Sequence, residues 1–442
     1  MSLTGLLFML GFFAGVGLCL FRHPFWGLAT YIAVYYLDAP DRWWGATLPN
    51  LRWSLLIALV TLISLLIHKR GSRSGWLSNG PIWVVIVYVA WMWVQLLWAQ
   101  TGDEHASGLN IFSKYIIVLF LVYSIIDTKE RALNFIFVHV LGCFYLGVIA
   151  YTTYTGGRLD GVGGPGISDS NSLGMQMGTA VLCGAGLYLI FNDWRKWVAA
   201  ASVPFTLNTL VMTGSRGAFV ALACGGLAMF LLRPRDQLSR IAIYIFLGAG
   251  LFLYLASDFF WDRIETVSTA VDDVQEVDQS VATRLELFRQ QWRMAKDYPL
   301  GIGHKGTTHL SVSYLSEEHM SNTGGRSSHN TILSTLVDQG FIGALLWLLL
   351  MGLCVLRCRA LRTQYQRAGD LELGWMAAAV FGALVVYWSA GMFAPLLKAE
   401  VYMWLIALVC AAGRLLDEHL QEAREAPAPR QLGLGSSAAY RA

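Results

Sequence analysis

Apolar runs occupy most of the chain, and one long polar stretch, residues 258–329, interrupts them. A membrane-spanning helix needs roughly 20 apolar residues. The runs that reach or approach this length are residues 4–21, 25–38, 52–68, 81–99, 110–126, 131–153, 173–191, 196–212, 216–233, 240–257, 330–356, 373–391 and 395–413. The alternating pattern of a membrane barrel is absent, so the spanning segments are predicted to be helices. We predict an all-α, polytopic membrane helix bundle of about 12–13 spans, depending on whether residues 4–38 form one element or two.

The polar stretch divides the chain into four predicted parts. Residues 1–257 form the N-terminal part of the transmembrane bundle, 258–329 a loop domain, 330–413 the C-terminal part of the bundle, and 414–442 a disordered cytoplasmic tail. Within the loop, apolar residues at three- and four-residue spacing over 283–297 predict a short amphipathic helix near the membrane surface.

Composition agrees with a membrane protein. Charged residues make up only 14% of the chain, whereas a soluble domain carries about 25%. The net charge of +3 gives no basic footprint for nucleic acid. All seven cysteines lie in apolar runs or at a basic edge, so no disulfide framework is predicted in the outside loops. The first apolar run lacks a small-residue cleavage site and is predicted to be a retained anchor.

Lysine and arginine in the short loops predict the orientation. Basic loops alternate with arginine-poor loops, and basic loops normally face the cytoplasm. The basic loops contain Lys69, Arg70, Arg73, Lys129, Arg131, Arg195, Lys196, Arg233, Arg235, Arg240, Arg357, Arg359, Arg362 and Arg367. The arginine-poor loops are 39–51, 100–109, 154–172 and 392–399. This alternation predicts that 258–329, 154–172 and the turn 213–217 lie outside.

Arg216 opens a predicted helix on the outside. The N-terminus of a helix adds partial positive charge and free N–H groups, which favours anions. Gly214 and Gly217, on either side of Ser215-Arg216, are expected to let a ligand approach the backbone. The structural alternative is an interfacial arginine that reaches toward the headgroups.

The polar loop carries two further candidates. Arg284 lies one position from the apolar stripe of the predicted surface helix, with Arg289 and Arg293 on its basic flank. The alternative is a helix that only covers the bundle. His329 precedes the 330–356 run, and histidine changes its charge near neutral pH. The alternative is a structural or solvated histidine.

The 154–172 loop is a weaker candidate for substrate binding. It contains Arg158, and Asp169 and Asn171 precede a predicted helix, which either residue could cap. The acidic residues of the polar loop lack regular ligand spacing and are predicted to be solvated; they are Asp272, Asp273, Glu276 and Asp278. No metal site and no cofactor motif is predicted.

Several motifs, taken in this order, resemble the O-antigen ligase family, whose wider clan includes O-antigen polymerases and bacterial protein O-oligosaccharyltransferases. They are Asp169-Ser170-Asn171, Ser215-Arg216-Gly217, Arg284, Trp292, Tyr298-Pro299-Leu300-Gly301-Ile302-Gly303, Ser328-His329-Asn330 and Gln339-Gly340-Phe341-Ile342-Gly343. The start of the chain, with Arg22-His23-Pro24-Phe25 and Tyr35-Tyr36-Leu37, is similar to a subgroup of O-glycosylation ligases.

The resemblance implies a GT-C-like glycosyltransferase of the bacterial inner membrane with a periplasmic active site. Its donor would be an undecaprenyl-diphosphate-linked glycan and its acceptor the lipid A-core, so that transfer completes lipopolysaccharide. Arg216 and Arg284 would bind the diphosphate without a metal, and His329 would activate the acceptor or contact the diphosphate. Arg158, Asp169, Asn171 and Arg289 would add substrate contacts. Membrane lipids are the other expected partners, and no cofactor is expected.

Three alternatives remain open. A polymerase of the clan would use the same donor with a second lipid-linked glycan as acceptor, and a protein O-oligosaccharyltransferase would use a serine or threonine. A transporter belongs to a different class. The chain lacks the internal repeat typical of transporters, and the middles of most spans carry no charge.

Overall fold

The computed structural model describes residues 2–68, 75–234, 250, 274–316 and 325–425, with side chains described up to 417 and not for 274–284. Every regular element in these residues is helical, which confirms the all-α class. The α-helices are α1 (Leu3–Phe21), α2 (Phe25–Leu37), α3 (Trp53–Ile67), α4 (Gly80–Gln95), α5 (Gly102–Ile125), α6 (Lys129–Thr153), α7 (Ser170–Ile190), α8 (Trp194–Met212), α9 (Arg216–Leu232), α12 (Val274–Asp297), α13 (Gly306–Tyr314), α14 (Thr331–Ala368), α15 (Leu371–Ala390) and α16 (Glu400–Glu425).

Six of the described helices are long and apolar enough to cross a membrane: α1, α5, α6, α7, α14 and α15. Helices α3, α4 and α9 are apolar but shorter. The chain is therefore a polytopic membrane protein. The predicted total of about 12–13 spans stays a prediction, because the expected run at 240–257 lies outside the described residues except for Gly250.

Residues 4–38 form two helices joined by the turn Arg22-His23-Pro24. His23 stabilises this turn because its Nδ1 accepts the N–H of Phe25 at 3.0 Å. Helix α2 has 13 residues, fewer than the roughly 20 that cross a bilayer without tilt. The open question of one element or two is therefore answered as two helices.

Helix α16 differs from the sequence prediction at both ends. It begins at Glu400, so residues 395–399 belong to a loop and not to the expected span. It continues past Arg414 to Glu425, and the expected disorder is therefore wrong for residues 414–425. Arg414 is buried and donates to the carbonyl oxygens of Tyr123 (2.9 Å) and Ile126 (2.5 Å) at the end of α5. The last carbonyl groups of a helix have no hydrogen-bond donor within that helix. Arg414, on the neighbouring helix α16, is the donor for these two carbonyls.

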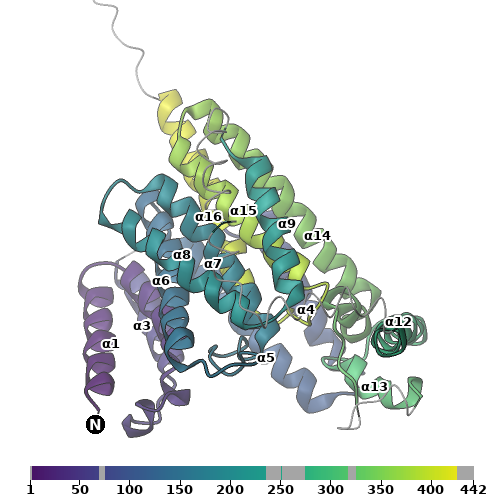
Figure 1. The fold of residues 1–442 in the computed structure, drawn as a ribbon. Coiled ribbons are helices and arrows are strands. Elements are labelled where there is room, and N and C mark those ends of the chain that lie inside the picture. Colours follow the sequence, from purple (N-terminus) through teal and green to yellow (C-terminus); the bar gives the residue numbers. More distant parts are fainter. Residues whose placement is uncertain (1, 69–74, 235–249, 251–273, 317–324, 426–442) are drawn as a thin grey trace, which may run out of the picture.

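The core of the bundle is formed where α15 packs between α7 and α9 (Figure 1). Small residues let these helices approach closely. A β-carbon built on Gly225 of α9 would lie only 2.6 Å from the carbonyl oxygen of Gly382 of α15. Close approach through small residues is a common way for membrane helices to gain packing contacts.

Ion pairs and hydrogen bonds gather the predicted basic loops at one end of the bundle, which we call the basic end. Lys129 Nζ lies 3.2 Å from Asp370, and Arg195 lies 3.7 Å from Glu130. These contacts join the loops before α6, α8 and α15. These three predicted basic loops therefore lie at the same end of the bundle.

The opposite end carries the loops in which candidate chemistry was predicted, and we call it the motif end. It comprises residues 154–169, 213–217, 298–316, 325–331 and 391–399. Helices α12 and α13 lie at this end, away from the C-terminal end of α16 (Figure 1). The assignment of the motif end to the outside of the cell stays a prediction.

Candidate functional site

Arg216 is the first residue of α9, and its side chain is exposed. Ser215 caps the helix because its Oγ accepts the N–H of Ala218 at 3.3 Å. Within the described part of the chain, the Arg216 guanidinium has no hydrogen-bond or ion-pair partner. An arginine stays charged at all physiological pH values, so this group is available to an anion.

The 154–169 loop joins the Ser-Arg-Gly turn through Asn171. The Oδ1 of Asn171 accepts hydrogen bonds from Ser215 Oγ at 2.9 Å and from Arg158 Nη2 at 3.1 Å. Arg158 Nε also donates to the carbonyl oxygen of Thr213 at 3.3 Å. Two predicted substrate-binding residues, Arg158 and Asn171, are therefore brought to the residue that precedes Arg216.

Asp169 has a structural role in this arrangement. Its carboxylate accepts the N–H groups of Asn171 (3.0 Å) and Ser172 (3.1 Å) and so caps α7. The capping alternative that the sequence left open is the one observed. The cap fixes the first turn of α7, and with it the side chain of Asn171.

The two glycines around Ser215-Arg216 have different roles, and the one after Arg216 does not leave the room for a ligand that the sequence suggested. Gly214 has a φ of +56°, a left-handed conformation that favours glycine at the turn. A β-carbon built on Gly217 would lie 2.7 Å from Cβ and 2.9 Å from Cγ of Phe393. The space beside Gly217 is therefore filled by Phe393 of a distant loop.

That loop, residues 391–399, connects the segments of the motif end, and we call it the bridging segment. Thr331, the first residue of α14, holds it: Thr331 Oγ1 donates to Ala394 O at 2.7 Å and accepts the N–H of Leu396 at 2.9 Å. Asn330 Nδ2 donates to Met392 O at 3.3 Å. The start of α9 and the start of α14 thus contact the same segment.

Sequence reasoning assigned no role to the bridging segment beyond an arginine-poor loop. A β-carbon on Gly166 would lie 3.8 Å from the carbonyl oxygen of Lys398, so the 154–169 loop reaches it too. The same oxygen accepts a hydrogen bond from Tyr115 of α5 at 2.5 Å. The amino-acid composition of the bridging segment could not predict these contacts, because they are made mainly by backbone carbonyls.

His329 lies at the motif end with an exposed side chain, directly before α14. Asn330 caps the helix, since its Oδ1 accepts the N–H of Leu333 at 3.0 Å. Ser328 Oγ accepts the N–H of Asn330 at 3.1 Å and donates to its carbonyl oxygen at 2.8 Å. The backbone on both sides of His329 is therefore fixed, and Asn330 ties it to the bridging segment.

Arg284 falls in α12, and its side chain lies outside the described residues. Its predicted role stays a prediction. Arg289 is exposed and lies 3.9 Å from Glu286 on the same helix. Exposed ion pairs of this kind contribute little to stability. The described contacts do not bring Arg289 to the start of α9.

The motif Tyr298–Gly303 anchors α12 to the bundle. The N–H of Gly303 donates to Asp338 O at 2.9 Å, and the N–H of Phe341 donates to Pro299 O at 2.9 Å. Gln95 Nε2 of α4 donates to Leu300 O at 2.8 Å. These bonds pair the turn with the backbone of α14 at its kink, Gly340, where φ is +70°. The kink frees backbone groups that the turn then satisfies.

A buried histidine pair supports the same turn. His105 Nε2 lies 2.9 Å from Met92 O, and its Nδ1 lies 3.1 Å from Nδ1 of His304. Because the carbonyl requires a donor, we assign the proton of His105 to Nε2 and that of His304 to Nδ1. Burial lowers the pKa of His304 to about 3, so this histidine stays neutral. It has a structural role that the sequence did not reveal.

The acidic residues considered for a metal are not described by the structure. Asp272 and Asp273 lie outside the described residues, and the side chains of Glu276 and Asp278 do so as well. Among the residues that are described, no group of three or more His, Cys, Asp or Glu side chains is arranged to hold a metal ion. The metal-free mechanism stays a prediction.

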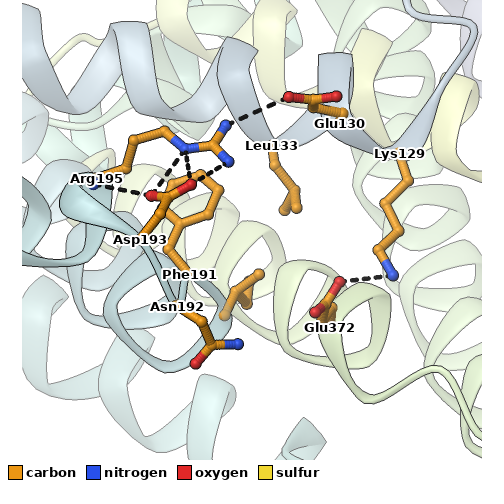
Figure 2. Close-up of a pocket in the computed structure, with 9 residues that line it drawn as sticks. Lys129, Glu130, Leu133, Phe191, Asn192, Asp193, Arg195 and Glu372 are labelled. Carbon is orange, nitrogen blue, oxygen red and sulfur yellow. Dashed lines mark hydrogen bonds and ion pairs between the residues drawn. The ribbon is translucent and has the colours of Figure 1, made fainter.

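A pocket of about 500 Å³ lies at the basic end, between α6, the α7–α8 turn and α15 (Figure 2). Its two cations are already paired: Lys129 Nζ lies 2.6 Å from Glu372, and Arg195 Nη2 lies 2.7 Å from Asp193. Arg195 also stacks over the ring of Phe191 at 4.2 Å. The pocket is therefore not the candidate anion site: it lies at the end opposite the predicted motifs, and its two cationic side chains are already paired with carboxylates.

Residues 200–348 match the family model for O-antigen ligase. The resemblance to the O-antigen ligase family is thereby confirmed over about a third of the chain. No curated protein matches the chain.

The O-antigen ligase segment contains Arg216, Arg284, Arg289 and His329, together with the Gly301–Gly340 junction. The 154–169 loop and the bridging segment lie outside it. The family consists of glycosyltransferase-like enzymes, so the match supports a function of the O-antigen ligase or polymerase type. It also implies lipid-linked glycans as substrates in general.

Proposed function

We propose that this protein transfers a glycan from undecaprenyl diphosphate to the lipid A-core on the periplasmic side of the bacterial inner membrane, as an O-antigen ligase. One observation carries the proposal. Arg216, an exposed arginine without a described partner, lies in the segment that matches the family and beside the Arg158–Asn171–Ser215 network. The site places this cation beside a hydrogen-bonded network that holds a second arginine, Arg158, at the end of a membrane bundle.

The reaction needs stabilisation of its leaving group. As the bond between the anomeric carbon and the phosphate oxygen breaks, the electron pair stays on the diphosphate. Fixed cations aimed at this developing charge stabilise the transition state more than the ground state. Arg216 and Arg284 supply the cations in this proposal, because a guanidinium binds two phosphate oxygens at once. Arg158 lies on the same network and adds a second contact.

The acceptor hydroxyl attacks the anomeric carbon and must lose its proton. We assign this proton to His329, whose neutral imidazole nitrogen is a suitable acceptor near neutral pH. The side chain is exposed at the motif end, and Ser328 and Asn330 fix the backbone around it. His304 does not compete for this role, because it is buried and bonded to His105.

Two related functions use the same donor. An O-antigen polymerase would transfer to a second lipid-linked glycan, and a protein O-oligosaccharyltransferase to a serine or threonine. A transporter is less well supported: the described mid-bundle histidine, His139, is bonded to Tyr36 at 2.6 Å and to Thr179 at 3.3 Å. Such bonds are typical of contacts that hold membrane helices together.

The proposal is tested with purified protein and one lipid-diphosphate-linked glycan donor. Three acceptors are supplied in parallel: lipid A-core, a second lipid-linked glycan and a folded protein with exposed serine and threonine residues. We expect a product only with lipid A-core, detected as a mass increase by one glycan. A product with either other acceptor would assign the corresponding alternative. No product with any acceptor, while the protein moves the donor across a vesicle membrane, would favour the transporter.

A further inference from the structure

The bridging segment exposes two large apolar side chains at the motif end. Met392 is 47% exposed and Phe393 is 44% exposed. Both belong to a loop and not to the lipid-facing side of a helix. Their positions are nevertheless fixed, because Thr331 binds the backbone at Ala394 and Leu396, and Asn330 binds it at Met392.

Phe393 also lies next to the candidate cation. It packs closely against Gly217, the residue after Arg216: a β-carbon built on Gly217 would lie only 2.7 Å from Phe393 Cβ, so a side chain there would clash. Arg216 itself is exposed. The residue that carries the exposed guanidinium therefore adjoins a fixed apolar surface. That surface belongs to a segment far from Arg216 in the sequence.

This juxtaposition has a defined chemical complement. Arginine binds phosphate oxygens, whereas exposed methionine and phenylalanine side chains gain free energy by contact with hydrocarbon. A molecule that carries an anionic group joined directly to a hydrocarbon chain satisfies both. A free diphosphate satisfies only the first, and a neutral lipid only the second.

We infer that Phe393 and Met392 form a contact surface for the first isoprenoid units of a prenyl diphosphate whose anionic group is held by Arg216. The inference rests on the proposed function, in which the donor is a prenyl diphosphate. It adds that Phe393 and Met392 help the protein to recognise this donor. In this arrangement the bridging segment makes the site prefer a prenyl diphosphate to a diphosphate without a chain. Phe393 acts on donor binding and takes no part in proton transfer.

The experiment measures binding, so it does not depend on catalysis. Farnesyl diphosphate and inorganic diphosphate are titrated into the purified protein in lipid nanodiscs, with empty nanodiscs as the blank for partition into lipid. Four proteins are compared: the unmodified chain, Phe393→Ala, Phe393→Leu and Phe21→Ala. Phe21 is the matched control, because it is 85% exposed and is the last residue of α1. The turn that follows it reaches the basic end, where His23 lies 3.9 Å from Asp127, just before α6.

For the unmodified chain we expect farnesyl diphosphate to bind at least ten-fold more tightly than inorganic diphosphate. Phe393→Ala should reduce this preference to about two-fold while leaving the affinity for inorganic diphosphate unchanged. Phe393→Leu, which keeps a hydrocarbon surface, should retain most of the preference, and Phe21→Ala all of it.

Three results would overturn the inference in different ways. If Phe393→Ala keeps the full preference, the bridging segment does not contact the prenyl chain, and the proposed function is unaffected. If the unmodified chain binds neither ligand above the blank, both the inference and the proposed diphosphate donor are wrong. A reduced affinity of Phe393→Ala for both ligands equally would show that Phe393 only supports the start of α9, which also overturns the inference.

Discussion

The backbones of Gly301 and Gly340 are in direct contact. A β-carbon built on Gly301 would lie 2.5 Å from the backbone nitrogen of Gly340, and one built on Gly340 would lie 2.6 Å from that of Gly301. Both residues have positive φ, +73° and +70°. This contact joins the turn after α12 to the kink in α14. It therefore fixes the position of α12 relative to α14, the helix that follows His329.

Alanine at Gly301 or Gly340 should therefore destabilise the protein and separate α12 from α14. A left-handed backbone costs a residue with a side chain about 1–3 kcal/mol, and the added carbon also clashes with backbone that cannot move aside. We expect a lower unfolding temperature and faster proteolysis between α12 and α13. Gly352→Ala is the control, because no atom lies within 4 Å of a β-carbon there. Unchanged stability of both variants would contradict the role of the junction.

Replacing Arg216 with lysine should reduce glycan transfer about a hundred-fold, since mutation of one transition-state donor typically costs this much. Lysine keeps the charge but loses the two-pronged contact with phosphate. Rates with saturating acceptor and varied donor provide the measurement. Arg367→Lys is the control and should retain nearly full activity, because Arg367 is exposed and lies in a predicted basic loop, away from the motif end. Full activity of Arg216→Lys would remove the diphosphate argument.

Asn171 should be a positioning residue for the cationic site. Its Oδ1 accepts from both Arg158 and Ser215, so Asn171→Ala should release Arg158 and raise the KM for the donor about ten-fold, the factor that corresponds to 1.4 kcal/mol. Asn171→Asp keeps the acceptor oxygen and places an acid in the first turn of α7, where it is favourable. It should restore the KM. Equal loss in both variants, with lowered unfolding temperature, would indicate a merely structural role.

Transfer should continue in excess chelator. The proposed mechanism neutralises the diphosphate with arginine, and no metal-binding motif was found in the sequence. In the same chelator-treated assay, His329→Ala should reduce product formation about a hundred-fold, a typical contribution of a general base. Activity that is lost in chelator, restored by magnesium and sensitive to Asp272→Asn would instead assign a metal site to the acidic run.

Cysteine labelling tests the orientation. Val312, which is 54% exposed, lies at the motif end, and the exposed Arg367 lies in a predicted basic loop. Each is changed to cysteine in a Cys224→Ala background, which removes the exposed native cysteine. An impermeant reagent added to intact cells with permeabilised outer membranes should label position 312 and not 367. The reverse pattern would place the motif end in the cytoplasm.

The sequence by itself determined the class of the protein and the ends at which its loops gather. Apolar runs of helical length have one stable form in a bilayer, because each helix satisfies its own backbone there. The short runs 25–38 and 196–212 also became helices, α2 and α8. Arg216 and His329 were recognisable because each is a polar residue at the start of an apolar run, and such starts are local features. The order of the motifs also indicated a resemblance to the O-antigen ligase family, which the match of the family model to residues 200–348 confirms.

Only the tertiary structure decided which of these residues meet. Phe393 fills the space beside Gly217, Asn171 binds Ser215, and Gly301 contacts Gly340; the two residues of each pair are at least 39 positions apart in the sequence. The sequence could not reveal these pairs because they depend on how loops between helices fold back, and the partners are often backbone carbonyls that every residue possesses. The same reason explains why the tail was wrongly predicted to begin at Arg414. In the sequence Arg414 is the first residue of a polar segment. In the structure its buried guanidinium donates to the carbonyl oxygens at the end of α5, and α16 continues past it.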